Sequence, residues 1–284
     1  MIGEGKMKSI EWQEQVNFEH YACLSSLAPN LITPSPPTVP SLMPDTWHWL
    51  YTHKIPSPLP TRSDGHPTAL PPGVPETFTQ RLWAGSHIQL HKEVQSDSRI
   101  TFRCELEPVI LKYGRRGPLA FSPIQIRAYD GEHCLLSERR TNVYRRPIDG
   151  AVFRQDDTRP PQLDRQPFPV VSRRIHLDEM ALLQYSSLLG ISNRIHYDYP
   201  YATKVEGYPG LVIQGPLIAQ LLTHQARDLE CVQKFRSISV LAIAPHFLGT
   251  PFYVNATRKS AHSISAWASD GRNSISMRVD IELH

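Results

Sequence analysis

Proline is unusually frequent in this chain and is concentrated in one stretch. Of the 26 prolines among 284 residues, half lie between positions 29 and 75. Because proline fixes φ and has no N–H to donate, this stretch can form neither a helix interior nor a central strand. It also contains the aromatic run Trp47-His48-Trp49-Leu50-Tyr51, which would be costly to leave in water. We therefore predict extended chain that docks on a folded body through these aromatic side chains.

The rest of the first half has the pattern of an antiparallel sheet. Runs rich in strand-forming residues follow Gly85, at 88–90, 98–107, 119–129 and 134–144. Glycine-containing turns lie at 113–117 and at Asp130-Gly131, and Asp-Gly between two such runs is a strong hairpin signal. The weaker helix candidates of this half are residues 9–27 and the region around Trp83.

Two helices open the second half. Asp178 can cap the first helix, which Gly190 ends. The second begins at Gly215, with Pro216 at its first position and leucines at helical spacing up to Leu229. Strands are then expected at 235–244, 251–259, 263–269 and 273–283, with a turn at 270–271.

These patterns predict an α+β chain with two units, residues 1–148 and 170–284, each combining an antiparallel sheet with helical material. The polar, proline-containing segment 149–169 between them has the composition of a linker. Lys and Arg number 30 against 27 Asp and Glu, so the net charge gives no reason to expect nucleic acid or a membrane surface as a partner. The longest nearly apolar run, 238–244, is too short to span a bilayer.

Cysteine usage bears on the compartment. Cys23, Cys104, Cys134 and Cys231 are too far apart in sequence to form a typical zinc or redox motif, and we interpret them as buried, reduced thiols. The first residues contain neither a secretory apolar core nor an Arg-rich transit pattern. A cytoplasmic location is therefore predicted, with mitochondrial import left open.

A long segment of the second half carries a recognisable motif. Residues 185–198, Tyr-Ser-Ser-Leu-Leu-Gly-Ile-Ser-Asn-Arg-Ile-His-Tyr-Asp, with 200–202 and 205–217, resemble the hydratase motif of the MaoC-like double-hotdog hydratases and dehydratases. The chain is similar to the subfamily of mesaconyl-C4-CoA hydratase, itaconyl-CoA hydratase and the type 2 hydroxyacyl-thioester dehydratases. First-half segments resemble this subfamily too: 47–51, 64–67, 70–72, 81–85, 112–117 and 138–145.

The resemblance implies two hotdog folds, each an antiparallel sheet wrapped around a helix, with one active site in the second half. It implies a hydro-lyase that hydrates an enoyl thioester or dehydrates a 3-hydroxyacyl thioester carried by coenzyme A or an acyl-carrier protein. A branched C5 dicarboxyl-CoA is a candidate substrate. No metal or redox cofactor, nucleic acid or membrane partner is expected, and a homodimer is compatible with the fold.

Such chemistry needs a group that moves the C2 proton, a group that handles water and donors for an enolate-like oxygen. Within the motif, His196 is the acid/base candidate, because its ordinary pKa lies near neutrality. Gly215 is the oxyanion donor, because its N–H lies at the positive end of a helix. Asn193 would share a face with His196 on one helical turn, where it could orient water or substrate or act as a local cap.

Two positions depart from the pattern that the resemblance implies. The usual acid five residues before the histidine is Ile191, and the usual histidine before the oxyanion glycine is Gln214. Isoleucine can neither transfer a proton nor hold a water. Either Asp198 or Asn193 has taken over, a residue of the first half reaches in, or the chemistry is altered.

Other motif side chains have alternative interpretations. Arg194, Tyr197, Asp198 and Tyr201 are expected to pin the motif or line the pocket through buried hydrogen bonds, with a direct chemical role for Asp198 as the alternative. The pair Arg115-Arg116 could bind coenzyme A phosphates or form a solvated turn. Trp47, Trp49 and Trp83 are interpreted as core and domain-contact aromatics.

Two further functions remain open beside the hydro-lyase. The substitution at Ile191 is compatible with a dehydratase or isomerase of specialised metabolism that acts on a bulky substrate. It is also compatible with a non-catalytic hotdog subunit.

Overall fold

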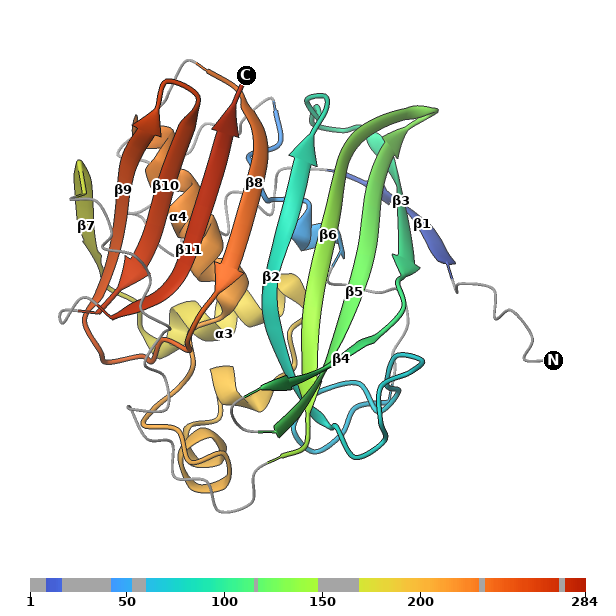
Figure 1. Ribbon diagram of the computed structural model, residues 1–284, viewed down its shortest axis with the longest axis vertical. Helices are drawn as coiled ribbons and strands as arrows, with labels where there is room; N and C mark the ends of the chain where they lie inside the picture. Colours follow the sequence, from blue (N-terminus) through green and yellow to red (C-terminus); the bar gives the residue numbers. More distant parts are fainter. Residues whose placement is uncertain are drawn as a thin grey trace.

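The computed structural model describes residues 9–16, 42–52, 60–114, 117–147, 169–229, 233–270 and 274–284. Its strands form one sheet with the order β1-β3-β5-β6-β2-β8-β11-β10-β9-β7, and β4 pairs with β5 (Figure 1). The strands are β1 (Ser9–Gln15), β2 (Gln80–Leu90), β3 (Arg99–Leu106), β4 (Ile110–Gly114), β5 (Gly117–Asp130), β6 (His133–Arg145), β7 (Val171–Ile175), β8 (Phe235–Ala242), β9 (Phe252–Ser260), β10 (Ser263–Ser269) and β11 (Ile275–Leu283). The described helices are α2 (Trp49–Thr52), α3 (Glu179–Leu189), the 3₁₀ turn η2 (Arg194–His196), the π-helical turn η3 (Tyr201–Val205) and α4 (Gly215–Leu229).

One strand pair joins the two halves of the chain. β2 and β8 are antiparallel neighbours, from Gly85 opposite Leu241 to Gln89 opposite Ser237. Gly85 has φ of 142°, and a Cβ atom there would lie 2.0 Å from the carbonyl oxygen of Val240. Only glycine therefore allows β8 to approach β2 so closely at this point. The β-strands of both halves consequently belong to one continuous sheet.

Local signals in the sequence define the two main helices. The Asp178 side chain accepts a hydrogen bond from the Ala181 N–H at 2.8 Å, and Gly190 ends α3 in the left-handed conformation with φ of 65°. α4 begins at Gly215 as predicted and packs against β9, β10 and β11. In Figure 1, α4 lies behind this part of the sheet.

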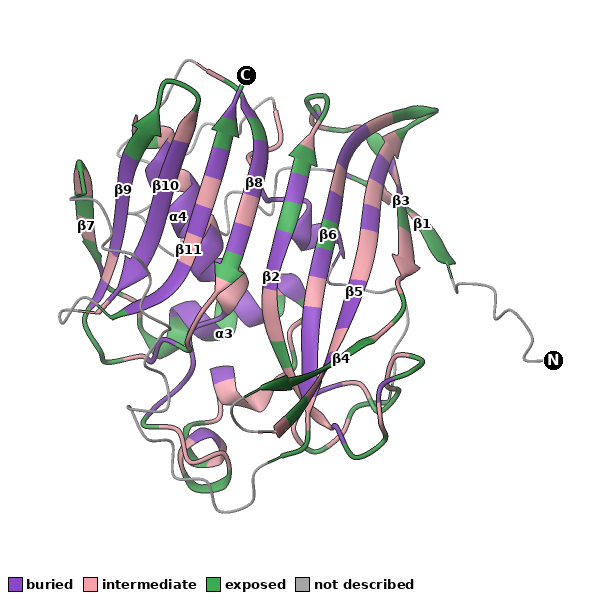
Figure 2. Cartoon of the chain, viewed as in Figure 1, coloured by how far each residue is buried: buried purple, intermediate pink, exposed green. Residues whose placement is uncertain are grey.

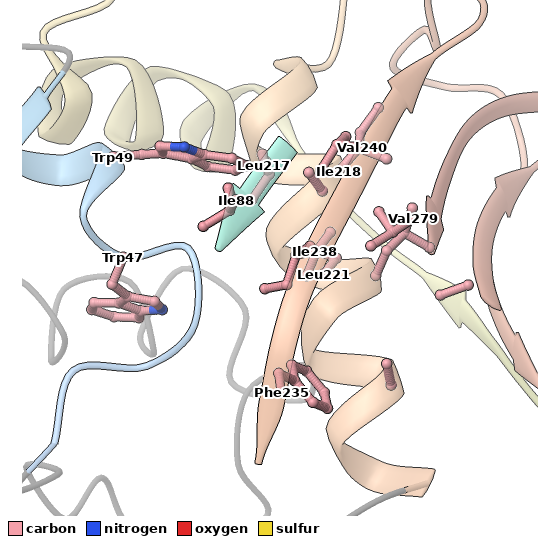
Figure 3. Packing of buried hydrophobic residues seen from close by; sticks show 14 of the residues in the cluster. Trp47, Trp49, Ile88, Leu217, Ile218, Leu221, Phe235, Ile238, Val240 and Val279 are labelled. Carbon is pink, nitrogen blue, oxygen red and sulfur yellow. The ribbon is translucent and has the colours of Figure 1, made fainter. Parts of the chain in front are cut away.

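Alternating side chains place the core between α4 and the sheet. Ile264, Ala266 and Ala268 of β10 belong to one buried cluster with Leu217, Leu221 and other residues of α4. Figure 3 shows α4 side chains meeting Ile238 and Val240 of β8 and Val279 of β11. In Figure 2 the buried positions follow α4 and the central strands, whereas β4 is exposed. This packing fixes the N-terminal end of α4 relative to the sheet.

The prediction of a docked aromatic segment is confirmed for the described part of that stretch. Trp47, Trp49, Leu50 and Tyr51 are buried members of the main core cluster. Trp49 meets Trp83 edge to face, with ring centroids 5.6 Å apart, as expected for core aromatics. Residues 17–41 and 53–59, which include many of the prolines, lie outside the described residues.

Both weaker helix candidates of the first half are wrong where the structure describes them. Residues 9–15 form β1, which pairs with β3 so that Trp12 stacks on Phe102 at 5.5 Å and Glu11 meets Arg103 at 2.6 Å. The region around Trp83 is part of β2. In both cases a distant partner strand decides the conformation.

The predicted strand runs are present with shifts of at most two residues at their ends, except that the run predicted at 88–90 is only the last part of β2, which begins at Gln80. The Asp130-Gly131 hairpin is confirmed between β5 and β6. β4 and β7 were not predicted. Cys104 and Cys134 are free but only partly buried, so the prediction of buried thiols is wrong for these two. Cys23, Cys231 and nearly all of segment 149–169 lie outside the described residues. Among the helices that are described, none has the length and apolar character needed to cross a bilayer.

Candidate active site

The motif follows α3 as two short turns. η2 contains Arg194 and His196, and the π-helical turn η3 begins at Tyr201. Asp198 joins the two turns: its Oδ2 accepts hydrogen bonds from Arg194 Nε and Nη2 at 3.0 and 2.7 Å, and its Oδ1 accepts one from the Tyr201 N–H at 3.0 Å. The Tyr201 N–H and the Arg194 guanidinium hold the pKa of Asp198 below its usual value. This geometry favours a structural role for Asp198 over the direct chemical role considered above.

His196 is buried, with 8% of its surface exposed, and its ring orientation is fixed. Nδ1 lies 2.7 Å from the carbonyl oxygen of Val212, which can only accept, so Nδ1 carries the proton. Nε2 then has its lone pair available, and it has no partner among the described residues. Burial lowers the pKa of His196 to about 4, despite the opposing effect of the hydrogen bond to Val212. His196 is therefore neutral at pH 7, with the lone pair of Nε2 available to accept a proton.

The segment after η3 connects His196 to the start of α4. Val212 donates its N–H to the carbonyl of Ile195 at 2.9 Å, while its own carbonyl accepts from His196. Gly215 follows three residues later and opens α4, and no described acceptor binds its N–H. Three residues span at most roughly 10 Å, so the Gly215 N–H lies within roughly that distance of Val212, which binds the imidazole. The first N–H groups of a helix favour a negatively charged oxygen.

Gln214 links this segment to α3. Its Nε2 donates to the Leu182 carbonyl at 2.7 Å and to Ser186 Oγ at 2.8 Å, both on α3. Its Oε1 is buried without a hydrogen-bond partner in the described chain. The donated hydrogen bonds tie the start of α4 to α3, which assigns Gln214 a positioning role.

Gly215 has a second constraint, from the first half of the chain. A Cβ atom at this position would lie 2.6 Å from Cε3 of Trp83. We predict that Gly215→Ala displaces Trp83 or the start of α4 and lowers kcat/KM on the order of 100-fold, because small misplacements are costly at such sites. Gly210→Ala is the matched control, because its Cβ would meet only the Leu248 carbonyl at 3.3 Å. Steady-state kinetics with thermal unfolding of both variants tests this, and equal kinetics would contradict it.

A loop of the first half reaches the motif. Thr61 and Pro67 form an isolated bridge, and Gly65 at the tip has φ of 86°. A Cβ atom on Gly65 would lie 1.9 Å from the Ser192 carbonyl oxygen, so the two backbones touch. Ser192 Oγ donates to the Gly65 carbonyl at 2.6 Å. Among the explanations for the missing acid, the structure thus favours a contribution from the first half.

This loop brings His66 to Asn193, with 2.7 Å between His66 Nε2 and Asn193 Nδ2. The Asn193 side chain makes no capping hydrogen bond to η2, so the alternative of a local cap is wrong. The sequence shows that the segment Asp64-Gly65-His66-Pro67 resembles the family, but it does not predict a role for His66. The signal that could have suggested one is a histidine directly after an Asp-Gly turn, within a segment that resembles the family.

The remaining predicted residues line or support the motif. Ile191 packs, partly buried, against the main core. Tyr201 Oη donates to Glu206 at 3.2 Å, and burial together with Glu206 raises the pKa of Tyr201 to about 12. The Arg194 guanidinium lies 4.2 Å from the centre of the Tyr201 ring. Arg115 and Arg116 lie outside the described residues.

Positive charge gathers beside His66. Burial, followed by the nearby Arg81 charge, lowers the pKa of His66 to about 4. Arg62 is bound by Asp64 at 3.3 Å and by the Thr79 carbonyl at 2.6 Å. Arg81 is half-buried and donates to Asn142 Oδ1 at 3.3 Å, but no described carboxylate pairs with it. Within the described part of the chain, the charge of this guanidinium is therefore not paired with a carboxylate.

Comparisons with known proteins identify the family. A family model described as hydroxyacyl-thioester dehydratase type 2 matches residues 46–247. The chain is 31% identical over 289 residues to the mesaconyl-C(4)-CoA hydratase of Chloroflexus aurantiacus, covering 97% of this chain and 99% of that protein.

Solved structures show the fold. HtdX of Mycobacterium tuberculosis matches with a TM-score of 0.67 at 12% identity, covering 98% of this chain and 100% of that one. A second protein of the same organism, described as a double hotdog fold, matches with a TM-score of 0.57 at 13% identity over 99% and 97% of the two chains. The predicted α+β double hotdog is confirmed. The chain belongs to the type 2 hydroxyacyl-thioester dehydratase family and is an enzyme of the hydratase and dehydratase class.

Proposed function

We propose that this protein interconverts an enoyl thioester and its 3-hydroxyacyl thioester by adding or removing water. The observation that carries the proposal is the neutral imidazole of His196, whose Nδ1–H is bound to the Val212 carbonyl three residues before the free N–H of Gly215. One group can move a proton, and the other can bind a developing oxyanion. These are the two functions that hydration of a conjugated thioester requires.

The proposed hydration needs a single proton-transfer group. His196 Nε2 accepts a proton from water as the water oxygen bonds to C3, and the electron pair of the C2–C3 double bond moves onto the thioester as an enolate. The Gly215 N–H stabilises the enolate oxygen. The imidazolium then returns the proton to C2, so that one water is consumed. Dehydration follows the same steps in reverse, and neither direction requires an acid at Ile191.

The finer proposal concerns the acyl group. A relative that aligns over nearly its whole length is named for mesaconyl-C(4)-CoA. The half-buried guanidinium of Arg81 has no described carboxylate partner and lies close enough to His66 to lower its pKa. A branched C5 dicarboxyl-CoA would place a free carboxylate in this positive environment. We propose that Arg81 binds that carboxylate by charge-assisted hydrogen bonds.

Absorbance of the enoyl-thioester bond tests both levels of the proposal. The purified protein is incubated with crotonyl-, mesaconyl- and itaconyl-CoA. We expect the absorbance to fall, and to fall faster with a dicarboxyl substrate than with crotonyl-CoA. No change with any substrate would contradict the proposed activity on these thioesters and favour a specialised dehydratase or isomerase, or a non-catalytic subunit.

Replacement of Arg81 tests the acyl group separately. Arg81→Gln should lower kcat/KM for the dicarboxyl substrate relative to crotonyl-CoA about tenfold or more, because a charge-assisted contact is lost. Arg139→Gln is the matched control: this arginine lies on β6, is 46% exposed and pairs with Glu107 at 2.7 Å. If Arg81→Gln lowers kcat/KM equally for both kinds of substrate, Arg81 does not recognise a carboxylate.

A further inference from the structure

The contacts of His66 with Asp64 and Asn193 indicate which ring nitrogen carries the proton. Nδ1 is 3.4 Å from Asp64 Oδ2, an ion-pair distance without hydrogen-bond geometry, and Nε2 is 2.7 Å from the side-chain amide of Asn193. The negative charge of Asp64 favours the tautomer with the proton on the nearer nitrogen, Nδ1. Nε2 is then an acceptor. Asp64 is itself held in place, because its Oδ1 accepts the His66 N–H at 2.8 Å and its Oδ2 accepts from Arg62 at 3.3 Å.

This tautomer in turn orients the Asn193 amide. An asparagine side chain can be turned by half a rotation with little change in shape, so its hydrogen bonds decide which atom faces which neighbour. Because His66 Nε2 accepts, the NH₂ group of Asn193 must face it. Oδ1 of Asn193 is left without a partner among the described residues. This oxygen belongs to the turn that contains His196, where the His196 N–H donates to the Asn193 carbonyl at 3.3 Å.

His66 has little freedom to move away. It is 7% exposed, and the preceding Gly65 touches the Ser192 backbone. The Arg194 N–H donates to the Asp64 carbonyl at 3.1 Å, and Arg194 Nη1 donates to the Ser63 carbonyl at the same distance. The loop is thus bound to the motif on both sides of Asn193. His66, from the first half of the chain, is therefore held in place beside the second-half motif, in which Ile191 occupies the usual position of the acid.

We propose that His66, supported by Asp64, is a positioning residue that holds the Asn193 amide so that its Oδ1 accepts a hydrogen bond from the reacting water or from the substrate hydroxyl. This inference rests on the proposed hydratase function and deepens it. The first half would then supply, through Asn193, the polar contact with water that Ile191 does not provide. His66 itself does not exchange a proton with the substrate.

A double-mutant cycle tests the coupling. His66→Phe and Asn193→Ala should each lower kcat by about 10- to 100-fold, as expected when a reacting group loses its alignment. If His66 acts through Asn193, the double variant should be little worse than Asn193→Ala alone. His66→Gln keeps an acceptor near the Nε2 position and should recover part of the rate. Multiplied losses in the double variant, or an unchanged kcat in a folded His66→Phe protein, would overturn the proposal.

A matched control separates this role from a general structural one. His246 is also buried, at 4% exposed, and its Nε2 contacts the Pro251 carbonyl at 3.2 Å. We expect His246→Gln to lower the unfolding temperature at least as much as His66→Gln does. The loss of kcat should be confined to the His66 variants. If both histidine variants lower kcat in proportion to stability, His66 has only a structural role.

The tautomer can be measured without any substrate. ¹⁵N NMR of imidazole-labelled protein should show His66 protonated on Nδ1 and unprotonated on Nε2 at pH 7. Asp64→Asn should shift this population toward the other tautomer and lower kcat. A wild-type His66 with its proton on Nε2 would overturn the inference even if no thioester were turned over. If the protein shows the expected tautomer but turns over no thioester, the proposed function is overturned, and with it the role of His66 in positioning the reacting water. The Asp64–His66–Asn193 alignment would still stand.

Discussion

His196→Ala is expected to lower kcat about 1,000-fold or more, within the range that acid–base groups contribute to catalysis, while the protein stays folded. The imidazole makes one described hydrogen bond, from Nδ1 to the Val212 carbonyl, so its removal leaves one unpaired acceptor. The measurement is single-turnover hydration of the best thioester, with circular dichroism to check folding. His246→Ala serves as the control for loss of a buried histidine. A folded His196→Ala enzyme with more than a tenth of the wild-type rate would exclude the proposed role.

The lowered pKa of His196 predicts how kcat/KM and the free energy of unfolding depend on pH. Because the pKa of His196 is about 4 in the folded protein, kcat/KM should stay constant on the acid side down to pH values near 4 instead of falling around 6.5. Between these values the unfolded chain binds the proton more tightly than the folded one. The free energy of unfolding should therefore fall as the pH is lowered from about 6.5 to 4. His66 has a similarly lowered pKa and contributes in the same direction.

Glu138→Ala should lower the free energy of unfolding by about 3–5 kcal/mol, because it leaves the buried Arg140 charge without its carboxylate. Glu138 is fully buried on β6. Its oxygens accept hydrogen bonds from four side chains: Arg140 at 2.8 and 2.9 Å, His48 at 2.8 Å, Trp49 at 3.1 Å, and Ser86. Burial alone would raise the pKa of Glu138, but the Arg140 charge and the His48 hydrogen bond hold it well below its usual range. Urea unfolding at pH 7 provides the measurement.

Two comparisons sharpen this test. Glu107→Gln, which breaks the exposed ion pair with Arg139, should cost about 1 kcal/mol or less. The double variant Glu138→Leu/Arg140→Met should recover only part of the loss, because it removes the unpaired Arg140 charge but still leaves His48, Trp49 and Ser86 without their acceptor. A loss below about 1 kcal/mol for Glu138→Ala would show that the cluster does not stabilise the fold as argued.

The sequence predicted best those features that local chemistry determines. The cap at Asp178, the helix end at Gly190 and the start of α4 at Gly215 all follow from neighbouring residues, and all are confirmed. β1 could not be predicted, because its partner β3 lies some ninety residues away and the partly buried Trp12 stacks on Phe102 of that strand. Local periodicity carries no information on such a distant partner.

In the candidate site, too, the sequence predicts individual residues but not the contacts that depend on the tertiary structure. His196 and Gly215 could be chosen from the motif, but the contact of His196 with Val212, which fixes its tautomer, depends on how the chain returns after η3. The contact of His66 with Asn193 joins residues 127 positions apart and requires the two halves to dock. The loop that includes Gly65 brings them together, because its backbone touches that of Ser192.

The pairing of β2 with β8 has a consequence for how the protein unfolds and refolds. Its backbone hydrogen bonds run across the boundary between the halves, and the core cluster includes Ile88 of the first half and Ile238 of the second. If one half unfolded, the paired edge of β2 or β8 in the other half would be exposed. We therefore expect a single cooperative transition in which activity and sheet content disappear together. We expect that neither half of the chain, expressed alone, folds into an active protein.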